Sequence, residues 1–161
     1  MSEPHTFETF LHWPADAGQA LPPAAEYSRN SLLSATGKAD VPASAPTVFG
    51  GDATRYNPEE LLLMALSQCH MLTYLALAAR RGVAVLAYQD RATGTLGAAE
   101  TGDVRGKSSM REVTLRPRVT VAKGSDPDIA MTMHEKAHAN CFIANSVNFP
   151  VTHQAEIFVE N

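Results

Sequence analysis

Two cysteines are the residues of this chain best suited to nucleophilic chemistry. Cys69 and Cys141 are its only cysteines. A free cysteine is most often a small buried apolar side chain, whereas a reactive one needs a nearby cation or a helix N-terminus to favour the thiolate. Arg29, Arg55 and the adjacent His70 are the candidate cations for Cys69. From the residues alone, both the packing and the thiol-chemistry interpretations stay open.

A second motif could bind metal. The segment 134–138, HEKAH, has the H-E-x-x-H pattern, in which two histidines on one helix face bind zinc and the glutamate acts as a base. Cys141 follows His138 closely enough to be a further ligand. Three fixed positions are a weak signal, and no further His or Glu stands at a usual spacing. A zinc-dependent hydrolase is therefore one alternative, and a solvated amphipathic helix with two surface histidines is the competing interpretation.

A long helix predicted over 57–82 must position Cys69. Pro58 suits the first helical turn, and Gly82 suits the residue after the last one. Acidic residues follow Pro58 and arginines precede Gly82, as the helix dipole favours. No charged residue lies between Leu61 and Ala79, so this helix should be buried nearly all round.

The same helix is long enough to span a membrane. Its centre is polar, however, and the mean hydropathy of the chain is −0.14. The polar residues at the centre are Ser67, Gln68, His70 and Thr73. We therefore expect the core helix of a protein that has no membrane partner.

Length and composition limit the classes of protein to which this chain can belong. The 161 residues fit a single domain, 1–161. The formal net charge is −4 and the Lys and Arg residues are scattered, so we expect no nucleic-acid partner. The first ten residues lack a basic region followed by an apolar core, so no signal peptide is predicted. Two cysteines are too few for a disulfide scaffold and fit a cytoplasmic protein with reduced thiols.

Strands are predicted on both sides of the long helix. Their ranges are 6–13, 25–35, 39–44, 83–96, 110–121 and 151–159. The segments 14–23 and 101–109 are predicted to be a connection and a hairpin loop. Asp126 suits the N-cap of a second helix over 128–140, and Pro117 predicts an edge strand or a bulge.

This order of elements predicts an α+β fold, with the helices laid on antiparallel sheet. An apolar helix in so small a domain leaves surface to cover, and a second copy of the chain is the natural cover. We therefore expect a homodimer.

Three segments resemble the OsmC/Ohr family of thiol-dependent hydroperoxide reductases. Residues 57–69, NPEELLLMALSQC, resemble its first cysteine signature, and residues 137–147, AHANCFIANSV, resemble its second. The YSR segment, 27–29, is similar to the stretch that carries the family's arginine. Their order and spacing agree over most of the chain. The resemblance favours thiol chemistry and implies an OsmC-like fold, in which antiparallel sheets wrap a long central helix in an intertwined homodimer.

The resemblance implies a role for each of four residues. Cys69 is the peroxidatic cysteine and Cys141 the resolving cysteine. Arg29 holds Cys69 as a thiolate and polarises the peroxide, and Glu59 positions the arginine. Glu59 and Cys69 lie about 15 Å apart along a straight helix, so Glu59 must act through a long side chain, across a dimer interface or after a break in the helix. The chain departs from the family at Phe142, where many members carry proline.

The implied activity is the reduction of organic hydroperoxides, and of hydrogen peroxide as a further substrate, in defence against oxidative stress. The two cysteines would form a disulfide, which an external dithiol such as a lipoyl protein would reduce. No cofactor is expected. A zinc-dependent hydrolase and a non-catalytic dimeric binding protein are the alternatives.

Overall fold

The computed structural model describes residues 3–13, 27–97 and 108–161. The chain forms two compact units, Met1–Leu61 and Leu62–Asn161, and each is described by itself. The predicted connection at 14–23 and most of the predicted hairpin loop at 101–109 lie outside the described residues.

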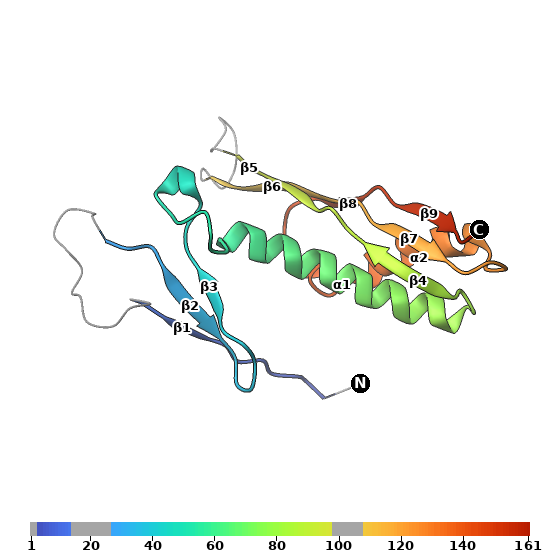
Figure 1. Cartoon of the computed structure of the whole chain (residues 1–161), viewed down its shortest axis with the longest axis horizontal. Coiled ribbons are helices and arrows are strands. Elements are labelled where there is room, and N and C mark those ends of the chain that lie inside the picture. The colour runs from blue at the N-terminus through green and yellow to red at the C-terminus, as the bar shows by residue number, and fades with distance from the viewer. Residues whose placement is uncertain (1–2, 14–26, 98–107) are drawn as a thin grey trace. The chain divides into compact units, whose positions relative to one another are not determined.

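The first unit contains a three-stranded antiparallel sheet (Figure 1). Its strands, in the order β1-β2-β3, are Phe10–His12, Ser31–Ser34 and Val41–Ala43. They confirm the strands predicted at 6–13, 25–35 and 39–44, although each is shorter. A short 3-10 helix, η1 (Thr47–Phe49), follows and ends at Gly50, whose φ of 77° is in the left-handed region that glycine adopts without strain.

Helix α1 spans Pro58–Arg80 and confirms the predicted long helix. The Asn57 side chain accepts a hydrogen bond from the Glu60 N–H at 2.8 Å, and the Glu60 carboxylate accepts one from the Asn57 N–H at 3.1 Å. This reciprocal capping box satisfies N–H groups that the helix itself leaves unpaired. Gly82, with a φ of 72°, follows the last turn as predicted.

The second unit contains two three-stranded sheets. The strands of one, in the order β4-β7-β9, are Val85–Gln89, Arg118–Val121 and Glu156–Val159. Those of the other, in the order β5-β6-β8, are Thr93–Gly97, Ser109–Leu115 and Val151–His153. The β4–β7 and β5–β6 pairs are antiparallel, whereas β6–β8 and β7–β9 are parallel. The prediction of purely antiparallel sheet was therefore wrong for this unit, while the α+β class is confirmed.

Each of the last three predicted strands, 83–96, 110–121 and 151–159, is divided into two strands. At the first break, the Asp90 carboxylate accepts hydrogen bonds from the Ser67 hydroxyl and from the Arg116 N–H, the latter at 2.6 Å. Pro117 lies at the second break, between β6 and β7, which are the central strands of their sheets. The predicted edge position was therefore wrong, because proline, which has no N–H to donate, falls where the ladder is already interrupted.

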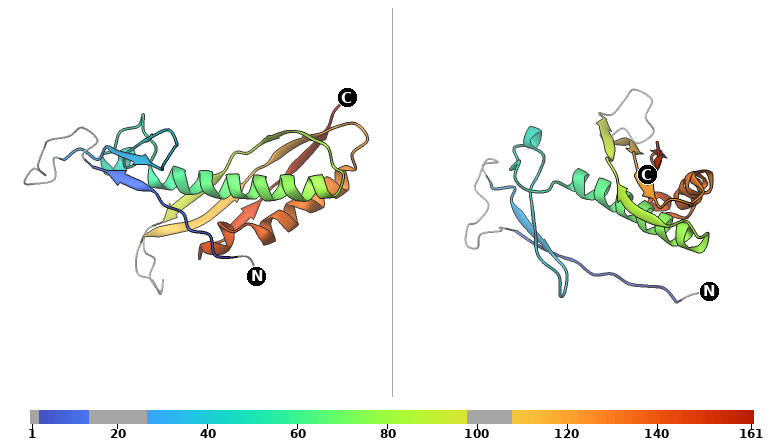
Figure 2. Two further views of the ribbon diagram at one scale, coloured as in Figure 1. Left: turned by 90° about the horizontal axis from the view of Figure 1, so that it is seen from below. Right: turned by 45° about the vertical axis from the view of Figure 1, so that its right-hand side comes forward.

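Helix α2 spans Pro127–Asn140 and confirms the predicted second helix. The Asp126 side chain accepts hydrogen bonds from the Asp128 and Ile129 N–H groups at 2.9 and 3.1 Å, so the predicted N-cap is also confirmed. Figure 2 shows α2 beside α1 in this unit. A hydrogen bond between His70 of α1 and His134 of α2 joins the two helices.

Helix α1 is less buried within this chain than its composition predicted. Its fully buried positions follow a spacing of four residues along a single line: Leu66, His70, Tyr74 and Ala78. Met64 and Leu72, on another line of the same spacing, are 47% and 56% exposed. The helix is also long and apolar enough to cross a membrane, a test that the core helix of a soluble protein passes too. Its polar contacts with α2 and with Asp90 favour the core interpretation.

Candidate functional site

Helix α1 presents Cys69 from its middle turns. The Cys69 side chain is half-buried and forms no disulfide. The next residue, His70, lies on the buried line of the helix, so the two side chains leave the helix in different directions. Cys69 is thus less buried than the neighbouring imidazole, which faces the core.

Cys141 directly follows the last residue of α2. Its N–H donates to the His138 carbonyl at 3.3 Å, and its Sγ accepts a hydrogen bond from the Ala144 N–H at 3.5 Å. The side chain is buried, with 1% of its surface exposed. The pKa of the Cys141 thiol is raised to about 11, mainly by burial and also by the hydrogen bond and charge of the neighbouring Cys69 side chain. The hydrogen bond from the Ala144 N–H acts in the opposite direction and lowers the pKa.

The structure thus brings together the two cysteines that the sequence singled out, although they are far apart along the chain. Their environments suit different tasks. A thiol with a pKa of about 11 is almost wholly protonated near neutral pH, so Cys141 is a poor first nucleophile. Cys69 is the more exposed of the two and is the better placed to meet a substrate.

Arg29 lies in the first unit, where the chain enters β2. Its guanidinium carbon is 4.9 Å from the centre of the Tyr27 ring, within the range of a cation–π contact. On another side, a Cβ placed on Gly50 would lie 3.1 Å from Arg29 Nη1. No carboxylate among the described residues forms an ion pair with Arg29. In the same unit, Glu59 Oε2 is buried without a hydrogen-bond partner among those residues, so the positioning of Arg29 by Glu59 stays a prediction.

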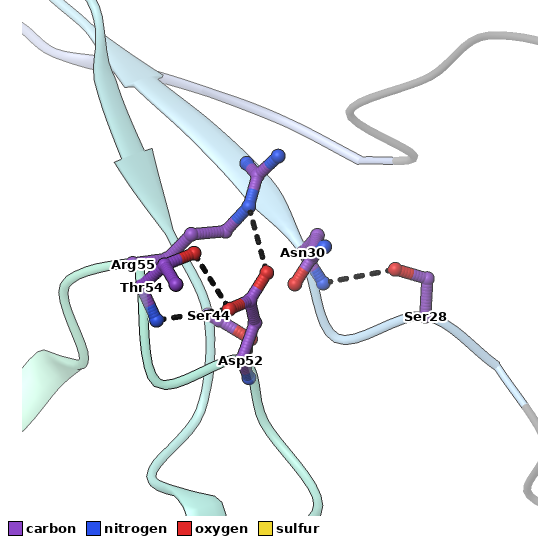
Figure 3. Close-up of polar contacts among 6 residues, drawn as sticks. All are labelled: Ser28, Asn30, Ser44, Asp52, Thr54 and Arg55. Carbon is purple, nitrogen blue, oxygen red and sulfur yellow. Dashed lines mark hydrogen bonds and ion pairs between the residues drawn. The ribbon is translucent and has the colours of Figure 1, made fainter.

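Arg55, the second candidate cation, already has a carboxylate partner. Figure 3 shows its side chain reaching Asp52, with 3.5 Å between Arg55 Nε and Asp52 Oδ2. The Thr54 N–H and hydroxyl donate to the same carboxylate at 2.9 and 2.7 Å. These Thr54 hydrogen bonds, with smaller contributions from Arg55 and Asn30, lower the pKa of Asp52. Arg55 therefore has a local structural role in the loop before α1.

His70, the third candidate cation, belongs to a cluster of four histidines in the second unit. His70 Nε2 lies 3.1 Å from His134 Nδ1, and the ring of His153 is centred 5.5 and 5.9 Å from those of His70 and His134. The His138 ring lies 5.7 Å from that of His153. Burial, together with smaller contributions from neighbouring histidines, lowers the pKa of His70 to about 4 and that of His134 to about 3. His70 is therefore neutral at pH 7 and cannot supply a positive charge to Cys69.

The same cluster corrects the interpretation of the HEKAH segment. His134 is fully buried and His138 is half-buried, so the expectation of two surface histidines was wrong for His134. The Tyr74 ring stacks on that of His134, with centres 4.1 Å apart. No group of three or more metal-ligating side chains with suitable geometry occurs within residues 3–13, 27–97 and 108–161. Glu135 instead lies 3.5 Å from His153 Nε2.

Sequence reasoning missed His70 and His153 as members of this cluster. The signal for His70 was its position, since Leu66, His70, Tyr74 and Ala78 share one line of α1. His134 likewise shares a face of α2 with Ala130 and Ala137, both buried. Nothing local marks His153, which reaches the cluster through the parallel pairing of β8 with β6.

Comparison with known proteins identifies the family. The OsmC-like protein family model matches residues 50–156. An OsmC-like protein of unknown function from Vibrio cholerae has a solved structure that is 34% identical, with a TM-score of 0.79 over 97% of this chain and 100% of that one. The chain therefore belongs to the OsmC-like family. A search of curated proteins finds no match.

More distant structures share the fold. An organic hydroperoxide resistance protein from Elizabethkingia anophelis is 17% identical, with a TM-score of 0.69 over 99% of this chain and 100% of that one. The organic hydroperoxide resistance protein OsmC from Legionella pneumophila is also 17% identical, with a TM-score of 0.67 over 96% and 97% of the two chains. These likenesses confirm the predicted OsmC/Ohr fold.

Proposed function

We propose that this OsmC-like protein is a thiol-dependent peroxidase that reduces organic hydroperoxides, with Cys69 as the attacking residue. The observation that carries the proposal is the pairing of a half-buried Cys69 with a buried Cys141 whose pKa is raised to about 11. Family membership and the names of the Elizabethkingia and Legionella proteins support the choice of substrate.

The first step is a nucleophilic displacement on the peroxide. The Cys69 thiolate attacks one oxygen of the hydroperoxide, so that an S–O bond forms while the O–O bond breaks. The leaving alkoxide takes up a proton and departs as an alcohol, or as water when the substrate is hydrogen peroxide. The Cys69 sulfur is oxidised by two electrons to a sulfenic acid.

The second step joins the two cysteines. The Cys141 sulfur attacks that of the Cys69 sulfenic acid, an S–S bond forms, and the hydroxyl group leaves as water with the thiol proton of Cys141. Burial is the main cause of the raised Cys141 pKa, and the charge of Cys69 is a smaller one. A neutral sulfenic acid removes the smaller contribution, so Cys141 is easier to deprotonate once Cys69 has reacted. An external dithiol then reduces the disulfide by exchange and is itself oxidised.

Arg29 is the cation we assign to the Cys69 thiolate. The other two candidate cations are less suitable: His70 is neutral at pH 7, and Arg55 already forms an ion pair with Asp52. Arg29 has no carboxylate partner among the described residues and matches the family's arginine segment. We include Glu59 in the site as the group that orients Arg29, since its buried Oε2 has no hydrogen-bond partner in the described part of the chain.

The working form that we propose is a cytoplasmic homodimer. Met64 and Leu72 are apolar side chains of α1 that are exposed within a single chain. A second copy of the chain would cover them and remove them from water.

Intact-mass spectrometry tests the proposed function directly. One equivalent of cumene hydroperoxide should convert the wild-type chain to a species lighter by two hydrogen atoms, with an internal Cys69–Cys141 disulfide. Cys141→Ser should stop at a Cys69 oxidation product after one turnover, and Cys69→Ser should not consume peroxide with dihydrolipoamide. Full peroxide consumption by Cys69→Ser would overturn the mechanism. A wild-type protein whose thiols stay reduced would favour a non-catalytic binding protein.

A further inference from the structure

We propose that Tyr27 is a positioning residue whose ring, braced by Trp13, holds the Arg29 guanidinium for its work on Cys69. This inference rests on the proposed function, because it assigns Tyr27 a role through Arg29. All the contacts that carry it lie inside the first unit.

Tyr27 and Arg29 are two residues apart in the segment that leads into β2. The guanidinium carbon lies over the Tyr27 ring, 4.9 Å from its centre. An aromatic face attracts a cation at this distance and takes up none of its N–H groups in a conventional hydrogen bond. Tyr27 can therefore hold the guanidinium in place while its N–H donors serve another partner.

Trp13 holds Tyr27 in turn. The two rings meet edge to face, with centres 6.2 Å apart and planes at 83°, an arrangement that aromatic pairs prefer. The Trp13 indole N–H donates to the Ser28 carbonyl at 2.7 Å. The Ser28 hydroxyl accepts the Asn30 N–H at 3.2 Å (Figure 3). Two hydrogen bonds, one to the Ser28 carbonyl and one to the Ser28 hydroxyl, thus hold the backbone between Tyr27 and Arg29.

Arg29 has two further neighbours in the first unit, namely Gly50 and an open hollow. Gly50 packs against the guanidinium, because a Cβ at that position would lie 3.1 Å from Arg29 Nη1. Arg29, Tyr27 and Trp13 also line a hollow of about 550 Å³ with Leu11 and Ser31. The guanidinium is therefore held between the Tyr27 ring and Gly50, while the arginine side chain also lines an open hollow.

The test measures how Cys69 reacts in Tyr27 variants made in a Cys141→Ser background. We expect Tyr27→Leu to slow the reaction of Cys69 with cumene hydroperoxide about two- to fivefold at pH 7, the size of one exposed cation–π contact. Tyr27→Phe and Tyr27→Trp keep an aromatic face and should restore most of the rate. Tyr56→Leu, which removes an exposed tyrosine of the same unit, is the matched control.

A double-mutant cycle separates positioning from folding. In an Arg29→Ala background, Tyr27→Leu should have no further effect, because the group that it positions is gone. Equal slowing in both backgrounds, or no rescue by Tyr27→Phe, would overturn the proposal while leaving the peroxidase function intact. Failure of the wild-type thiols to react with peroxide would overturn the proposed function itself, and Tyr27 would lose its assigned role with it.

Discussion

His70 Nε2 and His134 Nδ1 lie 3.1 Å apart in the interior of the second unit. One of the two nitrogens donates the shared hydrogen bond and the other accepts it, so at least one ring must be neutral at its bonded nitrogen. Along the buried line of α1, His70 lies between Leu66, a member of one apolar cluster, and Tyr74, a member of the other. A positive charge on this pair would be poorly solvated.

This arrangement predicts that the fold loses stability in mild acid. The folded-state pKa values of His70 and His134 are about 4 and about 3, both below the ordinary 6.5 of an unfolded chain. The unfolded chain therefore binds more protons below pH 6.5. Stability should be fully present above that pH and fall as the pH drops toward 4, by up to about 1.4 kcal/mol per pH unit for each histidine. Urea unfolding, followed by circular dichroism of the helices at several pH values, measures this slope.

His134→Gln is the variant that isolates this effect. It should be less stable than wild type at pH 7, because it breaks a buried hydrogen bond, but its stability should fall less steeply with acid. His12→Gln removes an exposed histidine of β1 and should keep the wild-type slope. Parallel slopes in His134→Gln and wild type would show that the cluster does not control acid unfolding.

The HEKAH segment should not be a zinc site. His134 Nδ1 is hydrogen-bonded to His70, and the His138 ring lies beside that of His153. The two histidines of the segment are therefore taken up by contacts with other histidines. We expect the purified protein to lack stoichiometric zinc and His138→Ala to keep peroxide reduction. Elemental analysis and an activity assay check both points. One zinc per chain that is lost in His138→Ala would revive the hydrolase interpretation.

The parts of the fold that sequence predicted best are those fixed by local chemistry. The bounds of α1 followed from Pro58 and Gly82, and the start of α2 followed from the Asp126 cap. In both cases the deciding residue acts within one helical turn of the boundary. The sequence also singled out Cys69 and Cys141 through their resemblance to the family signatures, and their chemical roles stay predictions.

The parts that sequence missed depend on long-range contacts. Asp90 divides a predicted strand because it binds Ser67 and the Arg116 N–H, which lie 23 and 26 residues away. The parallel pairing of β8 with β6 brings His153 into the histidine cluster. Strand periodicity specifies which face a residue takes but not which strand lies beside it, so neither the breaks nor the cluster could be read locally.

The exposed line of α1 should be a dimer contact. Leu72 is 56% exposed, and it lies in the stretch of α1 between Leu61 and Ala79 that contains no charged residue. Leu72→Glu should dissociate the proposed homodimer, because burying an unpaired carboxylate against apolar side chains is unfavourable. Sedimentation velocity over a range of concentrations measures the change. Ala139→Glu adds the same charge at an exposed position of α2 and should leave the dimer intact, and a monomeric wild type would contradict the prediction.

The last prediction concerns the cation that activates Cys69. An arginine beside a thiolate favours the charged form of the thiol. Arg29→Ala should therefore leave less of Cys69 as a thiolate at pH 7 and slow peroxide attack strongly. Glu59→Gln should have a smaller effect, because it removes only the group that orients the arginine. Ultraviolet absorbance of the thiolate against pH, in a Cys141→Ser background, reports Cys69 alone. Arg55→Ala is the control and should leave the titration in place, since Arg55 is engaged by Asp52. A shift in Arg55→Ala with none in Arg29→Ala would transfer the role to Arg55.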